Sequence, residues 1–276
     1  MKKGALLLLS CLLAFFPSSA KVIKVLAIGN SFSQDAVTQY LYELAKAQGD
    51  SLVIGNAYIP GCPIDRHLEN LRTAKHDYLY QKIVGGVLTN ERDADLRRII
   101  LDEPWDVITL QQASHLSGLS ESYVNLPNLK RAVLLLATNH DVQFMWHMTW
   151  AYANDFKDAR FKNYGNDQKR MYNAIVACMR AEVTKSLISK VIPTGTAIQL
   201  ARYHYGDILN RDGMHLSYTL GRYTAACTWC EALTGRNIDG NNFLPENIDK
   251  EMARMCQIVA HEACFMQYIG QYDLSF

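Results

Sequence analysis

The sequence lacks a charge imbalance, and beyond its first twenty residues it also lacks long apolar runs. Its 276 residues include 28 Lys and Arg and 27 Asp and Glu, a formal net charge of +1. Without an excess or a run of basic residues, neither nucleic acid nor a membrane surface is predicted as a partner. No stretch after residue 20 is long and apolar enough to predict a membrane span.

Cysteine is also scarce, and segments of biased composition are missing. One of the seven cysteines lies in the first twenty residues, and the others are too few for a fold of this length held together by disulfides. Their pairing does not follow from the sequence. There is no internal repeat, no low-complexity segment and no linker rich in Pro or Gly. We therefore predict that residues 21–276 form a single domain.

The first twenty residues have the pattern of a cleaved secretory signal. Two lysines precede an apolar run that ends at Phe16, and Ala20 closes a segment of small residues. This pattern predicts a signal peptide over residues 1–20 and a secreted or periplasmic protein. A lipoprotein attached at Cys11 is the less favoured alternative, because the apolar run continues beyond that cysteine.

Short apolar runs alternate with longer patterns of helical period along the rest of the chain. Buried strands are predicted within residues 22–29, 51–61, 105–112, 141–150 and 189–202. Helices are predicted over residues 36–49, 63–74, 93–104, 126–138 and 166–187. This alternation is typical of a three-layer α/β/α sandwich with a central, mainly parallel sheet. We predict a five-stranded sheet, with residues 78–90 as an inserted hairpin around Gly85 and Gly86.

A Gly-Asn-Ser sequence follows the first predicted strand. In parallel α/β sheets, binding and catalytic residues gather at the carboxyl ends of the strands. Ser31 falls at such an end, and Gly61, Gln112 and His147 lie at or near the ends of three others. Ser31 is therefore a candidate nucleophile. The alternative is an ordinary turn or N-cap residue, since Gly, Asn and Ser are common in turns.

A second informative segment lies near the other end of the chain. Asp212 and His215 are three residues apart in a loop that precedes a helix with an apolar face, closed by Gly235. A carboxylate at this spacing can accept a hydrogen bond from one imidazole nitrogen and leave the other as an acceptor. A serine hydroxyl needs such a base to act as a nucleophile. The alternative is a plain turn before a capped helix.

Together these residues resemble the SGNH (GDSL-like) hydrolase superfamily. The likeness is carried by Gly29-Asn30-Ser31-Phe32-Ser33 after the first predicted strand, by Gly61 after the second, and by Asp212-x-x-His215. The resemblance implies a flavodoxin-like α/β/α fold and a serine esterase or acetylesterase that needs no cofactor. It also implies that Ser31 is the nucleophile, His215 the general base and Asp212 the residue that orients this base.

The same resemblance implies an oxyanion hole made of three donors. These are the backbone N–H of Ser31, that of Gly61 and a side-chain amide at the end of the third predicted strand. Members of the superfamily usually carry Gly-x-Asn-Asp there, whereas this chain has Gln111 and Gln112. Because alternate residues of a strand face opposite sides, only one glutamine is expected to reach the site. We favour Gln112 and keep Gln111 as the alternative.

Three further residues are candidates for substrate contact. Asn30 adjoins Ser31, whereas His147 and Trp150 end the fourth predicted strand before a long polar and aromatic connection. Long connections are often functional. The alternatives are support of the turn for Asn30 and edge packing for the two aromatic side chains. No metal site is predicted. A His-Glu-x-x-His motif is absent, and Cys227 and Cys230, which have a Cys-x-x-Cys spacing, lie on an apolar helix face.

The expected function is hydrolysis of O-acyl esters by a Ser-His-Asp triad through an acyl-enzyme. An acetyl group on a carbohydrate is the favoured substrate, on the basis of the resemblance, the predicted export and the aromatic connection. A lipase or lysophospholipase of the same fold is one alternative, and a non-catalytic glycan-binding protein is another. The identity of the glycan, the position of the ester and the oligomeric state do not follow from the sequence.

Overall fold

The computed structural model describes residues 22–272 and 274. The predicted signal peptide over residues 1–20, with Cys11, therefore lies outside the described residues. Within the described part of the chain, no helix combines the length and the apolar character that crossing a membrane requires.

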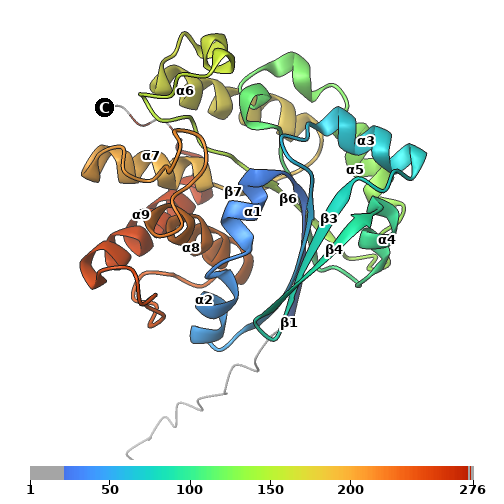
Figure 1. The fold of residues 1–276 in the computed structure, drawn as a ribbon, viewed down its shortest axis with the longest axis horizontal. Coiled ribbons are helices and arrows are strands. Elements are labelled where there is room, and N and C mark those ends of the chain that lie inside the picture. Colours follow the sequence, from blue (N-terminus) through green and yellow to red (C-terminus); the bar gives the residue numbers. More distant parts are fainter. Residues whose placement is uncertain (1–21, 273, 275–276) are drawn as a thin grey trace, which may run out of the picture.

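A seven-stranded sheet forms the centre of the fold (Figure 1). The strand order is β4-β3-β2-β1-β5-β6-β7, and β2, β1, β5, β6 and β7 run parallel to their neighbours within this group. The predicted number of five strands is correct for this parallel part and wrong for the whole sheet. The strands are β1 (Val22–Gly29), β2 (Ser51–Tyr58), β3 (Tyr78–Val84), β4 (Val87–Ala94), β5 (Val107–Leu110), β6 (Gln143–His147) and β7 (Lys190–Ile192).

The two additional strands are the predicted hairpin, which extends the sheet instead of standing apart from it. β3 pairs antiparallel with β2, and β4 pairs antiparallel with β3. Gly85 and Gly86 both have positive φ, at 61° and 84°, as the tight turn between the strands requires. β4 is exposed along most of its length and carries Glu91, Arg92 and Asp93, so its charges protect the open edge from pairing with another chain.

Helices cover both faces of the sheet. α3 and α5 pack together on one face, where α4 contacts β2, whereas α1, α2, α7, α8 and α9 pack together on the other (Figure 1). This arrangement has the predicted three layers. The α-helices are α1 (Ser31–Val37), α2 (Leu41–Ala47), α3 (Ile64–Thr73), α4 (Leu96–Leu101), α5 (Leu126–Leu134), α6 (Gln168–Cys178), α7 (Thr194–Tyr205), α8 (Leu220–Thr234) and α9 (Lys250–Tyr268). Short helical turns are η1 (Ser114–Leu116), η2 (Ser120–Tyr123), η3 (Ala159–Tyr164) and η4 (Met179–Val183).

The segment predicted as one helix over residues 36–49 forms two helices. α1 begins earlier, at Ser31, and α2 begins at Leu41. Tyr40 separates them with φ 70° and ψ −28°, a left-handed conformation that a residue with a large side chain rarely adopts. The chain changes direction there, and the Tyr40 hydroxyl donates a hydrogen bond to the carbonyl oxygen of Tyr218, 2.9 Å away.

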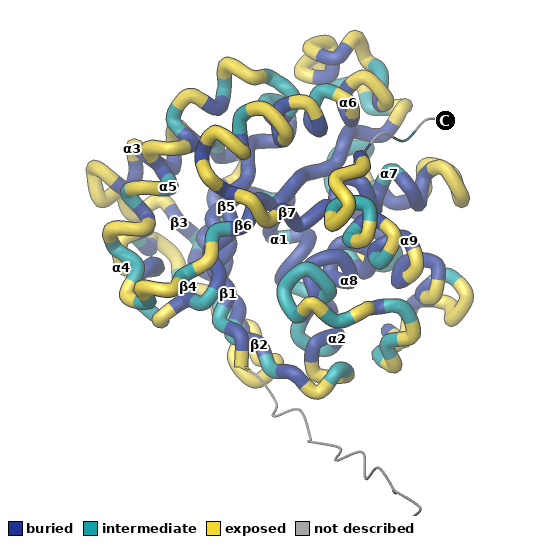
Figure 2. The backbone as a smooth tube through the Cα atoms, turned by 180° about the vertical axis from the view of Figure 1, so that it is seen from behind, coloured by how far each residue is buried: buried dark blue, intermediate teal, exposed yellow. Residues whose placement is uncertain are grey.

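The interior of the molecule follows the strands and the inner sides of the helices, as the burial colours show (Figure 2). β1 lies near the middle of the strand order, with β2 on one side and β5 on the other. The chain therefore leaves β1 toward one edge of the sheet and later returns to its opposite side. In doubly wound sheets the carboxyl end of such a strand is the place where ligands bind.

Candidate active site

The turn after β1 places Ser31 at the carboxyl edge of the sheet. β1 ends at Gly29, and Asn30 caps α1 by accepting a hydrogen bond from the backbone N–H of Phe32 at 3.0 Å. Ser31 is the first residue of α1 and is half-buried. A Cβ atom on Gly29 would lie 2.6 Å from Ser33 Oγ and 2.8 Å from the Gln111 amide, so only glycine fits at the end of this strand.

The side chains of Ser31, His215 and Asp212 form a continuous chain of hydrogen bonds. Ser31 Oγ lies 2.9 Å from His215 Nε2, and Asp212 Oδ2 lies 2.7 Å from His215 Nδ1. Because the carboxylate only accepts, Nδ1 carries the proton and Nε2 is the acceptor for the serine hydroxyl. The His215 side chain is 20% exposed and that of Asp212 is 47% exposed, so the chain of hydrogen bonds is open to solvent on one side.

The loop that carries the histidine also fixes the carboxylate. Asp212 Oδ1 accepts hydrogen bonds from the backbone N–H groups of Met214 and His215, at 3.0 and 2.6 Å. Burial acts to raise the pKa of Asp212, but these two N–H groups and the His215 ring outweigh it and lower the pKa below its ordinary value. The Asp212 carboxylate is therefore ionised at neutral pH and can accept the hydrogen bond from His215 Nδ1.

A buried aspartate that the sequence analysis missed attaches this loop to the helix of the serine. Asp35 lies in α1 and is fully buried. Its oxygens accept from Arg211 Nη1 at 3.1 and 3.2 Å, from Arg222 Nε and Nη2 at 3.0 and 2.6 Å, and from the backbone N–H of Leu216 at 2.9 Å. Asp35 thus holds the residue next to His215 against the helix that begins with Ser31. The only signal in the sequence is the pair of arginines that flank the Asp212–His215 block.

Gly61 lies in the loop that follows β2, beside the turn of Ser31. The parallel register pairs Gly29 with Tyr58, and Asn30 Nδ2 donates to the carbonyl oxygen of Cys62 at 3.2 Å. Gly61 is exposed and has a φ of 60°, a conformation that favours glycine. The turn of Ser31 and the Gly61 loop are therefore joined by one buried hydrogen bond.

Gln112 does not lie as the sequence analysis expected. Its Nε2 atom donates to the carbonyl oxygen and the hydroxyl of Ser122 at 2.7 and 3.1 Å, and its Oε1 atom accepts from the backbone N–H groups of Ile64 and Ala113. Both amide hydrogens are used inside the protein, so the predicted role of Gln112 as an oxyanion donor is wrong. β5 ends at Leu110, so strand alternation does not apply to the residues after it.

Gln111 is the glutamine that lies at the turn of Ser31, where it contacts Asn30. Its Nε2 atom donates to Asn30 Oδ1 at 2.9 Å, and its Oε1 atom accepts from His147 Nδ1 at 2.8 Å. Asn30 in turn donates to Cys62. A buried chain of hydrogen bonds therefore runs from His147 to the Gly61 loop and fixes the orientation of each amide along it.

The three residues predicted to contact substrate are buried below the candidate triad, so that prediction is wrong. Asn30 is 1% exposed, and His147 and Trp150 are fully buried. Trp150 stacks on Phe32 with ring centroids 4.0 Å apart, and its Nε1 atom donates to the carbonyl oxygen of Met214 at 2.9 Å. Asn30 supports the turn, as the alternative interpretation held, and Trp150 supports the histidine loop from inside the protein.

Burial of His147 predicts a specific loss of stability in acid. Burial lowers the pKa of His147 to about 3, against about 6.5 for an exposed histidine, and Nε2 has no partner among the described residues. The unfolded chain therefore binds the proton first as the pH falls. The free energy of unfolding is therefore not reduced by this histidine above about pH 6.5. It falls as the pH is lowered from about 6.5 to 3, and at pH 4 the loss is at most about 3 kcal/mol.

Urea unfolding at pH 7 and pH 4 measures this effect. In His147→Gln, the difference in unfolding free energy between the two pH values is expected to be smaller than in the wild type. The matched control is His140→Gln, because the His140 side chain is exposed. An unchanged pH dependence in His147→Gln would show that this histidine does not contribute to the acid sensitivity.

The cysteines do not add a second reactive group to the site. Cys227 and Cys230 are fully buried on α8, as their predicted position on an apolar helix face implies, and all six cysteines of the described chain are unpaired. Burial raises the pKa of the Cys62 thiol to about 12, so it stays protonated beside Gly61. Within the described residues, no three His, Cys, Asp or Glu side chains are grouped so as to hold a metal ion.

Comparison with known proteins identifies a family without an assigned function. The sequence profile of DUF4886, described as a domain of unknown function, matches residues 24–263. No curated protein matches the sequence. The crystal structure of a DUF4886 family protein from Bacteroides uniformis ATCC 8492 is 46% identical in sequence. It has a TM-score of 0.86, with 88% of this chain and 95% of that chain covered.

More distant structures share the fold. LAE5, an alpha/beta hydrolase enzyme from the metagenome of Lake Arreo, has a TM-score of 0.50 and 12% identity over 78% of this chain and 96% of its own. Axe2, an acetylxylan esterase from Geobacillus stearothermophilus solved as a catalytic mutant, has a TM-score of 0.46 and 14% identity over 77% and 94%. The first likeness is one of fold alone, and the second is too weak to carry a conclusion. Because the profile covers residues 24–263 and a member is 46% identical, this chain belongs to the DUF4886 family.

Proposed function

We propose that this protein is a serine esterase of the SGNH type, with Ser31 as nucleophile, His215 as general base and Asp212 as its orienting partner. The observation that carries the proposal is the chain of hydrogen bonds from Ser31 Oγ through the imidazole to the Asp212 carboxylate, at 2.9 and 2.7 Å. A hydroxyl, an imidazole and a carboxylate in this order are the groups that nucleophilic acyl transfer needs.

The reaction proceeds in two steps. His215 Nε2 takes the proton of the Ser31 hydroxyl while Oγ attacks the ester carbonyl, and Asp212 stabilises the imidazolium that forms. The tetrahedral intermediate collapses, the alcohol leaves with the proton from His215, and the acyl group remains on Ser31. Water then gives its proton to His215 and attacks the acyl carbon. The bond from this carbon to Ser31 Oγ breaks, His215 returns the proton to Oγ, and the carboxylic acid leaves.

The negative charge of the intermediate requires donors that point at the oxygen. We assign this role to the backbone N–H groups of Ser31 and Gly61, whose two loops are joined by the hydrogen bond between Asn30 and Cys62. Each such donor contributes about 2.7–4 kcal/mol to the barrier reduction. Gln112 is left out of this set because its amide is already bonded to Ser122.

The favoured substrate is an O-acetyl group on a carbohydrate outside the cytosol. This choice rests on the resemblance to SGNH hydrolases and on the secretory pattern of residues 1–20. A lipase or lysophospholipase would instead prefer long acyl chains.

Purified wild-type protein tests the proposal with p-nitrophenyl acetate, butyrate and octanoate, and in parallel with an organophosphonate that labels activated serines. We expect turnover of the acetate that falls steeply with acyl length, and covalent labelling of one serine. Rates that rise with acyl length would favour a lipase. A folded protein that is neither labelled nor active on any ester would contradict the proposed chemistry and leave the glycan-binding alternative.

A further inference from the structure

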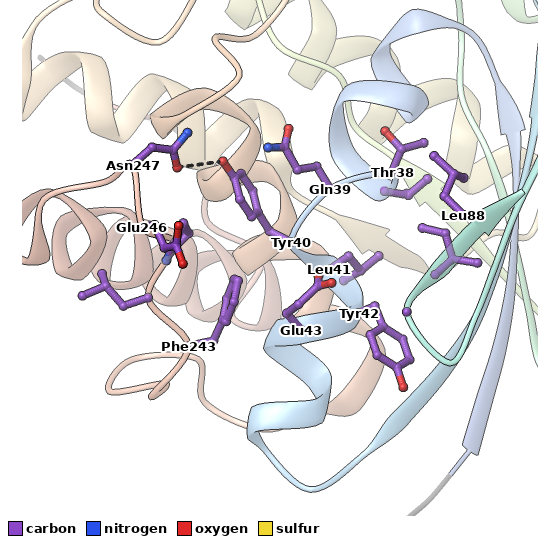
Figure 3. Close-up of a pocket in the computed structure, with 15 residues that line it drawn as sticks. Thr38, Gln39, Tyr40, Leu41, Tyr42, Glu43, Leu88, Phe243, Glu246 and Asn247 are labelled. Atoms are coloured by element: carbon purple, nitrogen blue, oxygen red, sulfur yellow. Dashed lines mark hydrogen bonds between the residues drawn. The ribbon is translucent and has the colours of Figure 1, made fainter.

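A cavity that the proposed reaction does not use lies beside the helix that begins with Ser31 (Figure 3). It has a volume of about 660 Å³ and lies between the α1–α2 junction, the tip of the β3–β4 hairpin and the segment 243–247. The left-handed Tyr40 sits where α1 gives way to α2, and its hydroxyl bonds Asn247 on the opposite wall at 3.4 Å. The cavity is therefore built from three parts of the chain that are distant in sequence.

One side of α1 leads from the candidate nucleophile to this cavity. Ser31 and Gln34 are the half-buried residues of α1, followed by Thr38 at its end, whereas the rest of the helix is buried. These positions are three and four residues apart, so they lie on one face of the helix. Thr38 lines the cavity, about 10 Å from Ser31 along the helix axis.

Amide side chains border this path on the side of the hairpin. Gln34 Nε2 donates to Gln81 Oε1 at 3.1 Å, and Gln81 Nε2 donates to Asn90 Oδ1 at 3.2 Å. Asn90 and Leu88 are two residues apart on β4 and therefore face the same side of the strand. Leu88, which is 41% exposed, lines the cavity. Hydrogen-bonded amides thus connect Gln34, on the same face of α1 as Ser31, to the strand whose Leu88 lines the cavity.

The lining of the cavity favours a neutral ligand rich in hydroxyl groups. None of its described lining residues is Lys, Arg or His, so an anionic ligand finds no opposite charge. Glu43 and Glu246 line it, and neither carboxylate has a hydrogen bond or ion pair within the described chain. Tyr42 and Phe243 add aromatic surface (Figure 3). Free carboxylates accept strong hydrogen bonds from hydroxyl groups, and aromatic faces pack against the C–H faces of sugar rings.

We propose that this cavity is a distal subsite that binds neutral sugar units of the glycan whose acetyl ester is cleaved at Ser31. The inference rests on the proposed esterase function and specifies its substrate as an oligosaccharide or polysaccharide several units long. The chain would lie along the exposed side of α1, with one acetylated unit at Ser31 and another unit between Phe243 and the hairpin. Acidic glycans and phospholipid head groups are disfavoured by Glu43 and Glu246.

Chain-length kinetics test the subsite. The substrates are O-acetylated xylo-oligosaccharides and gluco-oligosaccharides of one to six units, with acetylated oligogalacturonates as the acidic series. We expect kcat/KM to rise at least tenfold with length in a neutral series and to show no such rise in the acidic series. Equal rates at all lengths would overturn the subsite, and they would leave the esterase function standing if p-nitrophenyl acetate is still hydrolysed.

The double variant Glu43→Ala/Glu246→Ala tests whether the rise of kcat/KM with oligosaccharide length depends on the cavity. This rise is called the length gain below. The rates of the variant on each oligosaccharide are divided by its own rate on p-nitrophenyl acetate, which is too small to reach Thr38. The length gain is expected to disappear. The matched control is Glu251→Ala/Glu262→Ala, which removes two exposed carboxylates of α9 and should keep the length gain. A length gain that survives in Glu43→Ala/Glu246→Ala would contradict the proposal.

A binding measurement separates the failure of the subsite from the failure of the esterase. Titration calorimetry with unacetylated hexasaccharides of the neutral series uses the Ser31→Ala protein, with and without the two glutamate substitutions. Binding that weakens at least tenfold on loss of the glutamates supports the subsite whether or not the protein has esterase activity. Absence of binding to every neutral hexasaccharide by the folded protein would overturn it. Slower octanoate hydrolysis in Leu88→Ala without an oligosaccharide effect would place an acyl chain there instead.

Discussion

Ser31→Ala is expected to lower kcat/KM for p-nitrophenyl acetate on the order of 10⁶-fold and to abolish labelling by the organophosphonate. His215→Ala should cost a similar factor, because the hydroxyl attacks only when Nε2, 2.9 Å away, removes its proton. The double variant should be hardly worse than either single variant, since the two side chains act as one unit. Because Ser31 is only half-buried at the start of α1, the Ser31→Ala protein should have a thermal unfolding midpoint close to that of the wild type.

Ser33→Ala is the matched control for this experiment. Ser33 lies two residues away in the same turn, but its hydroxyl is buried and bonded to the carbonyl oxygen of Asn30 and to Asn56 Oδ1, both at 2.8 Å. Its loss should cost about 1–3 kcal/mol of stability and keep the labelling. Labelling that persists in Ser31→Ala, or that vanishes only in Ser33→Ala, would show that the wrong serine was assigned.

The candidate triad could be predicted from the sequence because each half of it is local. Gly29 and Ser31 mark the end of a strand, and Asp212 and His215 share one short loop. The parallel strands could also be predicted from local patterns, because each is an apolar run separated from the next by a segment of helical period. Only their meeting in space had to come from the fold, and parallel strands bring their carboxyl ends to one edge.

The surroundings of the triad could not be predicted, because they depend on contacts between distant segments. The prediction for Gln112 applied strand alternation to residues beyond Leu110, where β5 has already ended. His147 also stands at the carboxyl end of a strand, yet Trp229 of α8 packs edge-on against its ring at 4.9 Å and closes it off from solvent. An end of a parallel strand is exposed only where no later helix covers it, and the sequence pattern does not say which ends are covered.

Asp35→Ala is expected to have the largest effect on stability, about 3–5 kcal/mol in the free energy of unfolding. The substitution leaves the guanidinium groups of Arg211 and Arg222 without their carboxylate, at side-chain exposures of 25% and 12%, and it leaves the N–H of Leu216 without an acceptor. Asp35→Asn should cost less, because the amide oxygen can still accept from Leu216. Urea unfolding at pH 7 measures both.

The same substitution should lower kcat at temperatures where the protein is fully folded. Without Asp35, the loop of His215 is no longer held against α1, and the 2.9 Å contact with Ser31 is populated less often. Asp50→Ala is the matched control, since Asp50 is a buried carboxylate paired with Arg236 away from the triad. It should lower stability but leave the kcat of the folded protein near the wild-type value. If Asp35→Ala, fully folded in the cold, kept the wild-type kcat, Asp35 would hold the fold together without positioning the histidine.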